Sequence, residues 1–281
     1  MTLTALAVAA AAVSLIIRRR TWRAPGEVAA TVAVLLFGLA TYLSSDQCNV
    51  GETLWQATGL GYLDNFAGQL LYISGMLAVL QQALYRVADD VERTEIIDAF
   101  VRGPINLLIP GMLSTMYMSA ALHDEPVEFD VMAHGADVWA LLYRGMYLAC
   151  MAYITLLVFR VLRTVQRTGG GYVVSSVYLL GCAISLTTCT LRVVEMVHPT
   201  AHLNEIPVTL RALLSIVVSI AAAASWLIKM RGYRRLLRQT RTTRRQRRGD
   251  TLQSHRERLT PTTVGVHDDD GDQLTPANPR I

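Results

Sequence analysis

The sequence has little charge and almost no lysine. Asp, Glu, Lys and Arg make up 17% of its 281 residues, compared with roughly 25% in a soluble domain. Lys229 is the single lysine, beside 25 arginines. The 52% of hydrophobic residues fall in long continuous blocks, without the alternation of a half-buried strand. This composition excludes a pair of soluble domains and predicts an all-α bundle of membrane-spanning helices.

The signatures of common catalytic sites are missing. There is no G-x-S-x-G, no H-E-x-x-H and no P-loop. None of the six histidines lies inside an apolar block, so Ser74 has no histidine at membrane depth to activate it. Lys229 lies at the rim of the last apolar block, whereas a retinal protein needs a lysine deep in its last helix. We therefore expect neither an enzyme nor a bound cofactor.

The cysteines and histidines do not suggest a disulfide framework or a metal site. Cys182 and Cys189 are seven residues apart, about 10 Å along one helix, too far for a disulfide. With Cys48 and Cys150, they are expected to be small buried apolar residues. A divalent metal would need the side chains at the end of the sixth apolar block, and Pro199 is expected to end that helix between them. These side chains are Glu195, His198 and His202, with His123 and His134 from a neighbouring loop.

Seven apolar segments approach the ~20 residues that a spanning helix needs. They are residues 2–17, 27–44, 66–87, 104–122, 138–160, 172–197 and 207–228. The first is short and is followed by its positive charges, in "RRRTWR". A cleaved signal peptide carries its charges in front, so we interpret the segment as an anchor.

The basic residues predict how these segments are oriented. Arginines gather in segments 18–26, 88–103 and 161–171, while 45–65, 123–137 and 198–206 contain no Lys or Arg. The positive-inside rule then places the N-terminus outside and the C-terminus in the cytoplasm. We predict a seven-span plasma-membrane protein with a transmembrane domain over residues 1–228.

The chain continues after the last span with a strongly basic segment, 229–248. Its arginines directly follow a span, so we expect them to contact anionic headgroups on the cytoplasmic side rather than nucleic acid. They are Arg231, Arg234, Arg235, Arg238, Arg241, Arg244, Arg245, Arg247 and Arg248. Residues 249–281 are polar and contain several prolines, which predicts a disordered cytoplasmic tail.

Three arginines interrupt the predicted spans at a similar depth on the outer side. Arg144 lies six residues inside segment 138–160, Arg192 lies five residues before the end of 172–197, and Arg211 lies four residues into 207–228. Ionisable groups at such depth suggest a functional site, here an outward vestibule for an anionic solute or headgroup. The alternative is a salt-bridge cluster in which the arginines extend towards acidic residues. Its acidic members would be Glu195, Asp137 and Glu205.

Two of the predicted spans have polar or flexible features that suit either packing or a pathway. Pro110 cannot donate to the carbonyl group of Asn106, so a kink is expected in segment 104–122. Segment 172–197 is rich in small and hydroxyl residues, which permit close helix packing and hydrogen bonds between helices.

Three stretches resemble an actinobacterial family of heptahelical membrane proteins labelled as transporters. They read "NFAGQLLYISGMLAVLQQAL", "GGGYVVSSVYLLGCAISLTTCTLRVVE" and "RALLSIVVSIAAAASWLIKMRGYRRL". The resemblance covers roughly residues 1–240 and implies a transport function without a catalytic signature. Longer members of that family carry a cytoplasmic C-terminal domain, so this chain resembles a short form.

Two functions are compatible with the sequence. The first is a small transporter or channel-like protein whose pathway uses the fourth to seventh segments. The alternative is a non-transporting module, either a membrane sensor or a virus-encoded exclusion or immunity factor that acts through a membrane protein partner. An internal repeat would favour transport, and segments one to three do not clearly repeat in segments five to seven.

Overall fold

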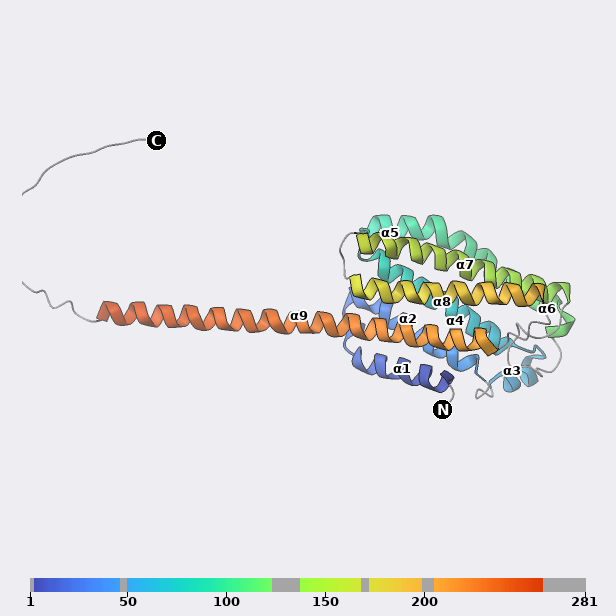
Figure 1. Ribbon diagram of the computed structural model, residues 1–281, viewed down its shortest axis with the longest axis horizontal. Coiled ribbons are helices and arrows are strands. Elements are labelled where there is room, and N and C mark those ends of the chain that lie inside the picture. The colour runs from blue at the N-terminus through green and yellow to red at the C-terminus, as the bar shows by residue number, and fades with distance from the viewer. Residues whose placement is uncertain (1–2, 46–49, 123–136, 168–171, 199–204, 260–281) are drawn as a thin grey trace, which may run out of the picture. The chain divides into compact units, whose positions relative to one another are not determined.

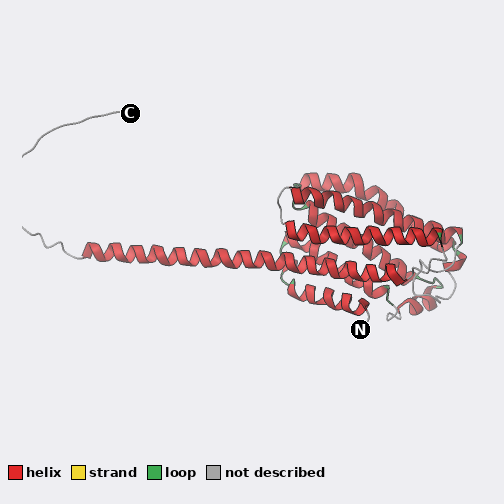
Figure 2. Cartoon of the chain, viewed as in Figure 1, coloured by secondary structure: helices red, strands yellow, loops and turns green. Residues whose placement is uncertain are grey.

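The computed structural model describes residues 3–45, 50–122, 137–167, 172–198 and 205–259, and these residues form helices without a strand among them (Figures 1 and 2). The α-helices are α1 (Leu3–Ile17), α2 (Pro25–Leu43), α3 (Val50–Thr58), α4 (Leu63–Leu84), α5 (Asp90–Ile97), α6 (Gly103–Met118), α7 (Val138–Arg167), α8 (Tyr172–Val197) and α9 (Glu205–Leu259). Short 3₁₀ turns lie at Thr21–Arg23 and Ala120–Leu122, and a π-helical turn at Asp98–Arg102 joins α5 to α6.

Within the described part of the chain, six helical stretches are long and apolar enough to cross a membrane. They are Gly26–Leu43, Leu63–Leu84, Asp90–Met118, Val138–Arg167, Tyr172–Val197 and Glu205–Tyr233. Each contains most of one of the last six predicted spans. By helix composition the chain is therefore a multi-pass membrane protein, and the predicted all-helical fold is confirmed.

The first predicted span forms a shorter apolar helix that lies along α9. The 15 residues of α1 rise about 22 Å, less than the ~30 Å hydrocarbon core. The Ser14 hydroxyl donates to the Ser219 carbonyl oxygen at 2.9 Å, and one turn later Arg18 reaches the Ala222 carbonyl oxygen. Since these contacts advance together, α1 and α9 run in the same direction. This pairing agrees with α1 as a seventh segment of the bundle.

Two predicted loops are helical instead. Segment 88–103 forms α5 and the π-helical turn, so α6 continues a helix that begins at Asp90. Segment 161–171 is helical as far as Arg167, the last residue of α7. Hydropathy does not detect such polar turns. Acidic residues in the first turn of α5 and a basic residue in the last turn of α7 complement the helix dipole there.

The most buried of the membrane-length helices is α4. In its most apolar 18 residues 61% are buried, whereas the corresponding value for Asp90–Met118 is 17%, which places that helix at the edge of the bundle. Polar residues near the start of α4, Asn65 and Gln69, are buried as well, and the helix begins at Leu63, about one turn before the apolar run that predicted it at residue 66. Further along α4, Tyr72 packs edge-on against Phe37 of α2 with ring centroids 5.7 Å apart.

The chain separates into two compact units, Met1–Lys229 and Met230–Ile281. Helix α9 belongs to both and is helical as far as Leu259. The helix therefore includes residues 249–259, which the sequence assigned to the predicted tail. Arg, Gln and Leu in this stretch favour a helix, and the next proline is Pro261. The rest of the predicted tail, 260–281, lies outside the described residues.

Candidate functional site

For the bundle, we name the end at which α7 begins and α8 ends the outer end, and the opposite end the inner end. The names follow the predicted topology. All three arginines from the sequence analysis lie towards the outer end, on α7, α8 and α9. Arg144 and Arg192 are 6% and 4% exposed, and Arg211 is half-buried.

Arg192 is paired on its own helix. Its Nη1 atom lies 2.6 Å from Oε2 of Glu195, three residues further along α8. Side chains three residues apart share a helix face, which is why the sequence spacing suggested this pair. The pair therefore compensates one buried charge within α8.

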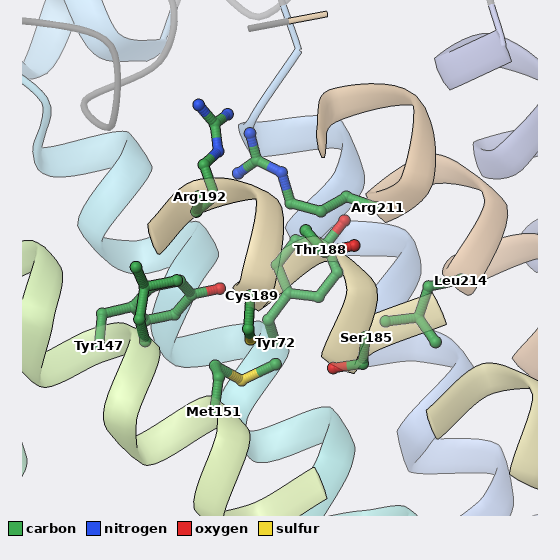
Figure 3. A pocket seen from close by; sticks show the side chains of 10 residues that line it. Tyr72, Tyr147, Met151, Ser185, Thr188, Cys189, Arg192, Arg211 and Leu214 are labelled. Carbon is green, nitrogen blue, oxygen red and sulfur yellow. The ribbon is translucent and has the colours of Figure 1, made fainter. Parts of the chain in front are cut away.

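Arg192 and Arg211 line one cavity between four helices. The cavity encloses about 420 Å³ of empty space, part of it open to the surroundings. Its lining residues are Tyr72 of α4, Tyr147, Leu148 and Met151 of α7, Ser185, Thr188, Cys189 and Arg192 of α8, and Arg211 and Leu214 of α9. Figure 3 shows both guanidinium groups at one end of this group of side chains, with Met151 and Ser185 towards the other. We call it the outer cavity.

Helix periodicity explains how α8 supplies so much of this wall. Ser185, Thr188, Cys189 and Arg192 are spaced i, i+3, i+4 and i+7, the pattern of a single helix face. Ser185 also contacts Thr155 of α7, with their hydroxyl oxygens 3.0 Å apart. The polar face of α8 therefore both lines the outer cavity and contacts α7.

A smaller cavity lies on the other side of Tyr72. It is lined by Thr4, Thr41, Ser44, Tyr72, Val208, Arg211 and Ala212, from α1, α2, α4 and α9 and the residue after α2. Tyr72 and Arg211 line both cavities, and the Tyr72 hydroxyl is 2.9 Å from that of Thr41. The buried Ser44 hydroxyl has no hydrogen-bond partner. Arg211 therefore borders both the outer cavity and this smaller one.

This arrangement is suited to binding a small oxyanion. A guanidinium binds carboxylate or phosphate oxygens through two parallel N–H bonds, and an apolar surrounding strengthens these bonds. Two arginines face the outer cavity, and the carboxylate that the structure places on one of them is Glu195. The described residues contain no group of three or more His, Cys, Asp or Glu side chains that could hold a metal ion.

Other predicted members of the site lie apart from this cavity. Arg144 is buried in α7 but is not among the residues that line the cavities described above. Glu205 and His198 are exposed. The remaining histidines of the metal hypothesis, His123, His134 and His202, lie outside the described residues. Helix α8 ends at Val197, as expected from Pro199.

Asp137 caps α7 at the outer end. Its Oδ1 accepts the Ala140 amide at 2.6 Å, and its Oδ2 accepts the Ser119 hydroxyl at 2.8 Å. Desolvation raises the pKa of Asp137, but these hydrogen bonds and others from the Ala121 and Ala120 amides outweigh it and hold the pKa below its usual value. Asp137 therefore fixes the start of α7 and its junction with the end of α6.

The proline-containing helix does not contribute to these cavities. Asn106 and Pro110 are both exposed on α6, and no residue of α6 lines the outer cavity or the one beside it. Instead, the third predicted span, α4, supplies Tyr72 to both. The prediction that the pathway uses the fourth to seventh segments therefore does not match these cavities at segment four.

Sequence analysis missed a buried ionic cluster at the inner end. Arg18 is fully buried, and its guanidinium donates to Thr31, to the carbonyl oxygens of Ala222 and Glu27, and to the Glu27 carboxylate at 3.0 Å. Lys229 also pairs with Glu27. We call Arg18, Glu27 and Lys229 the inner cluster. The sequence feature that could have indicated this cluster is Glu27, the single acidic residue between residues 18 and 44.

The remaining predicted residues have simpler positions. Cys150, Cys182 and Cys189 are buried and unbridged, in agreement with their interpretation as small apolar residues, and Cys48 lies outside the described residues. Arg231 is exposed. The other eight arginines proposed to contact lipid lie on the part of α9 whose side chains are not described.

No family model, curated protein or solved structure matches the chain. The chemistry of the outer cavity follows from its own side chains. Two arginines, two tyrosines, a serine and a threonine are among the residues that line it, in a multi-pass membrane protein.

Proposed function

We propose that this protein binds a small oxyanion, such as a carboxylate or phosphate, in the outer cavity and moves it across the plasma membrane. The observation that carries this proposal is that Arg192 and Arg211, from different helices, line the same cavity. Two guanidinium groups in the cavity wall attract and orient an anion. The side chains of Tyr72, Tyr147 and Thr188 make the rest of that wall partly polar.

The proposal includes the seven-span topology with the N-terminus outside. It is supported by α1, which runs parallel to α9 and is hydrogen-bonded to it at Ser219 and Ala222. It is also supported by the basic residues after Lys229, which would contact anionic lipid on the cytoplasmic side. The resemblance to an actinobacterial transporter family points to the same function.

The test is an anion-binding and flux experiment on the full-length protein. Thermal unfolding in lipid nanodiscs is measured against increasing acetate, phosphate and chloride, and flux of the tightest-binding anion is then measured in liposomes. We expect Arg192→Gln and Arg211→Gln to weaken binding about tenfold or more, because each removes a charge-assisted hydrogen bond. Arg163→Gln is the matched control, since Arg163 stacks on Phe159 away from the cavity.

The outcomes separate the two functions that the sequence left open. Binding with flux, both lost in the arginine variants, supports transport. Binding without flux supports the alternative, a non-transporting sensor or a virus-encoded exclusion or immunity factor. Equal binding in the wild type and both cavity variants overturns the proposed site.

A further inference from the structure

A third cavity lies towards the inner end of the same helices. Its empty space, part of it open to the surroundings, is about 240 Å³. It is lined by Val79, Gln82 and Ala83 of α4, Arg86 just after α4, Leu162 of α7, and Ser175 and Tyr178 of α8. We call it the inner cavity. Like the outer cavity, it draws on α4, α7 and α8.

Gln82 gives this cavity an unsatisfied acceptor. The side chain is 5% exposed, and its Nε2 donates to the Gly26 carbonyl oxygen at 3.2 Å. This bond fixes which end of the amide is the oxygen, and that Oε1 atom has no hydrogen-bond partner. A buried acceptor without a partner is costly, so a molecule that enters the cavity is favoured if it brings an O–H or N–H donor.

Arg86 supplies a positive charge with spare donors. Its one side-chain hydrogen bond to a described residue goes from Nη2 to the Ser225 hydroxyl, at 3.3 Å. A guanidinium has five N–H groups in a planar fork, and 3.3 Å is longer than the usual N–H···O range. Arg86 can therefore bind the oxygens of an anion without giving up a strong bond.

The inner cluster adds to the positive field around this cavity. Tyr178 of the cavity wall interacts electrostatically with Arg18, Arg86 and Glu27. Glu27 is paired with both Arg18 and Lys229. Two cations thus pair with one carboxylate, and Arg86 of the cavity wall adds a third positive charge, so the excess positive charge favours an anion.

Buried apolar residues separate the two cavities along the helices that they share. Tyr72 and Gln82 are ten residues apart on α4, about 15 Å, and Ser185 and Tyr178 are seven apart on α8, about 10 Å. Between these levels Met76, Val158 and Cys182 are all buried. The two cavities therefore lie at different levels of α4, α7 and α8, with packed side chains between them.

We propose that the inner cavity is a second anion site on the proposed transport path, selective for a small oxyanion that carries a proton, such as bicarbonate. Arg86 binds the charged oxygens and Gln82 Oε1 accepts the O–H group. An anion without a proton leaves Gln82 unsatisfied. This inference rests on the proposed function, since the inner site is the cytoplasmic end of the same path.

Bicarbonate and nitrate provide the test, because both are planar, trigonal and singly charged, and only bicarbonate carries an O–H group. Thermal unfolding of the full-length protein in nanodiscs is measured against each anion at constant ionic strength and pH 8. We expect bicarbonate to bind about tenfold more tightly than nitrate, the value of one additional hydrogen bond. Gln82→Met, which keeps the side-chain length but removes the acceptor, should abolish the preference and leave nitrate binding unchanged.

Variants of the two arginines distinguish the inner site from the outer one. Arg86→Gln should weaken both anions at the inner site, Arg86→Lys should restore part of the binding, and Arg163→Gln should match the wild type. Arg192→Gln should lower total binding but keep the bicarbonate preference. Gln82→Met and Arg86→Gln remove different groups of the inner cavity, an acceptor and a positive charge. If one of the two variants misfolds, the other still tests the site.

Each result has a definite meaning. If Arg192→Gln weakens binding while Gln82→Met and Arg86→Gln behave as the wild type, the inner site is wrong and the proposed function stands. If the inner variants alone have effects, the inner site stands and the outer cavity is not a binding site. No preference for bicarbonate in the wild type overturns the inference, because Gln82 would then be satisfied by water.

Discussion

Arg18 and Arg192 are both buried arginines beside a glutamate, but they have different surroundings. Arg18 bonds to α2 and α9 through two backbone carbonyl oxygens, a hydroxyl and a carboxylate. Arg192 pairs with Glu195 on its own helix and borders a cavity. A buried charge that is hydrogen-bonded to two other helices holds them together, whereas one that lines a cavity can also bind a ligand there.

Arg18→Met should cause the largest loss of stability. Removing one partner of a buried ion pair costs about 3–5 kcal/mol, because the remaining carboxylate stays buried. The Ala222 and Glu27 carbonyl oxygens also lose a donor. The free energy of unfolding in detergent, measured by thermal or denaturant titration, tests this.

The matching change at the outer end is Arg192→Met. Arg192→Met should cost clearly less than Arg18→Met, because Arg18 also bonds two backbone carbonyl oxygens of other segments, and because the side chain of Glu195 is 11% accessible against 6% for Glu27. Equal losses for the two variants would mean that Arg192 also joins helices and that the distinction is wrong.

The next largest effect is on binding. In Arg192→Gln with Arg211→Gln we expect the loss of anion-binding free energy to differ from the sum of the two single losses, because both guanidinium groups line the same cavity and can bind the same anion. Isothermal titration of acetate and phosphate into the detergent-purified protein measures the affinities. Strictly additive effects would indicate that the two arginines act at separate sites.

The sequence was most informative where long apolar runs end at prolines. Span 172–197 coincides with α8, and 27–44 is within two residues of α2, which has Pro25 in its first turn. It was least informative where polar residues form helices, as in α5 and in α9 after Lys229. There, hydropathy contains no signal and helix propensity decides.

The candidate site could be predicted only in part, for a geometric reason. Counting residues gives the depth of an arginine in its span but not the direction in which it points. Arg211 and Arg192 face one cavity and Arg144 does not line it, because the rotation of each helix about its axis depends on packing against its neighbours. Arg18 and Ala222 are 204 residues apart, and no local pattern connects them.

A smaller change in stability is expected at Asp137. Asp137→Ala removes the α7 cap and should cost about 1 kcal/mol at neutral pH. The folded protein holds the pKa of Asp137 below its unfolded value, so this stabilisation is present above the unfolded pKa and is lost as the pH falls through the folded pKa. Unfolding measured from pH 7 down to pH 3 should show the wild type converging on Asp137→Ala.

Asp137→Asn is the control for that experiment, because asparagine keeps an acceptor for the Ala140 amide but does not titrate. At neutral pH it should be more stable than Asp137→Ala but less stable than the wild type, because its amide group cannot accept from Ser119 as Oδ2 does, and it should lack this part of the pH dependence. If the free energy of unfolding has the same pH dependence in the wild type and in Asp137→Ala, the Asp137 carboxylate does not contribute as a cap.

A weaker effect is expected between the two cavities, where the hydroxyls of Thr155 and Ser185 are 3.0 Å apart. Hydrogen bonds between membrane helices are worth about 0.6 kcal/mol on average. A double-mutant cycle with Thr155→Val and Ser185→Ala, followed by unfolding in detergent, should give a coupling energy of that size. A coupling of zero would mean that α7 and α8 are held together at this level by apolar contacts alone.

The smallest effect is predicted for Lys229→Gln, which removes the other partner of Glu27. The Lys229 side chain is 45% exposed whereas that of Arg18 is fully buried, so water already screens most of the Lys229 charge. We expect a loss of about a few tenths of a kcal/mol, which disappears at high salt, while the Arg18→Met loss persists because buried pairs are screened much less. Unfolding of both variants at low and high salt measures this difference. If Lys229→Gln destabilised the protein as much as Arg18→Met, burial would not be what separates the two partners, and Glu27 would have to be treated as the centre of the inner cluster.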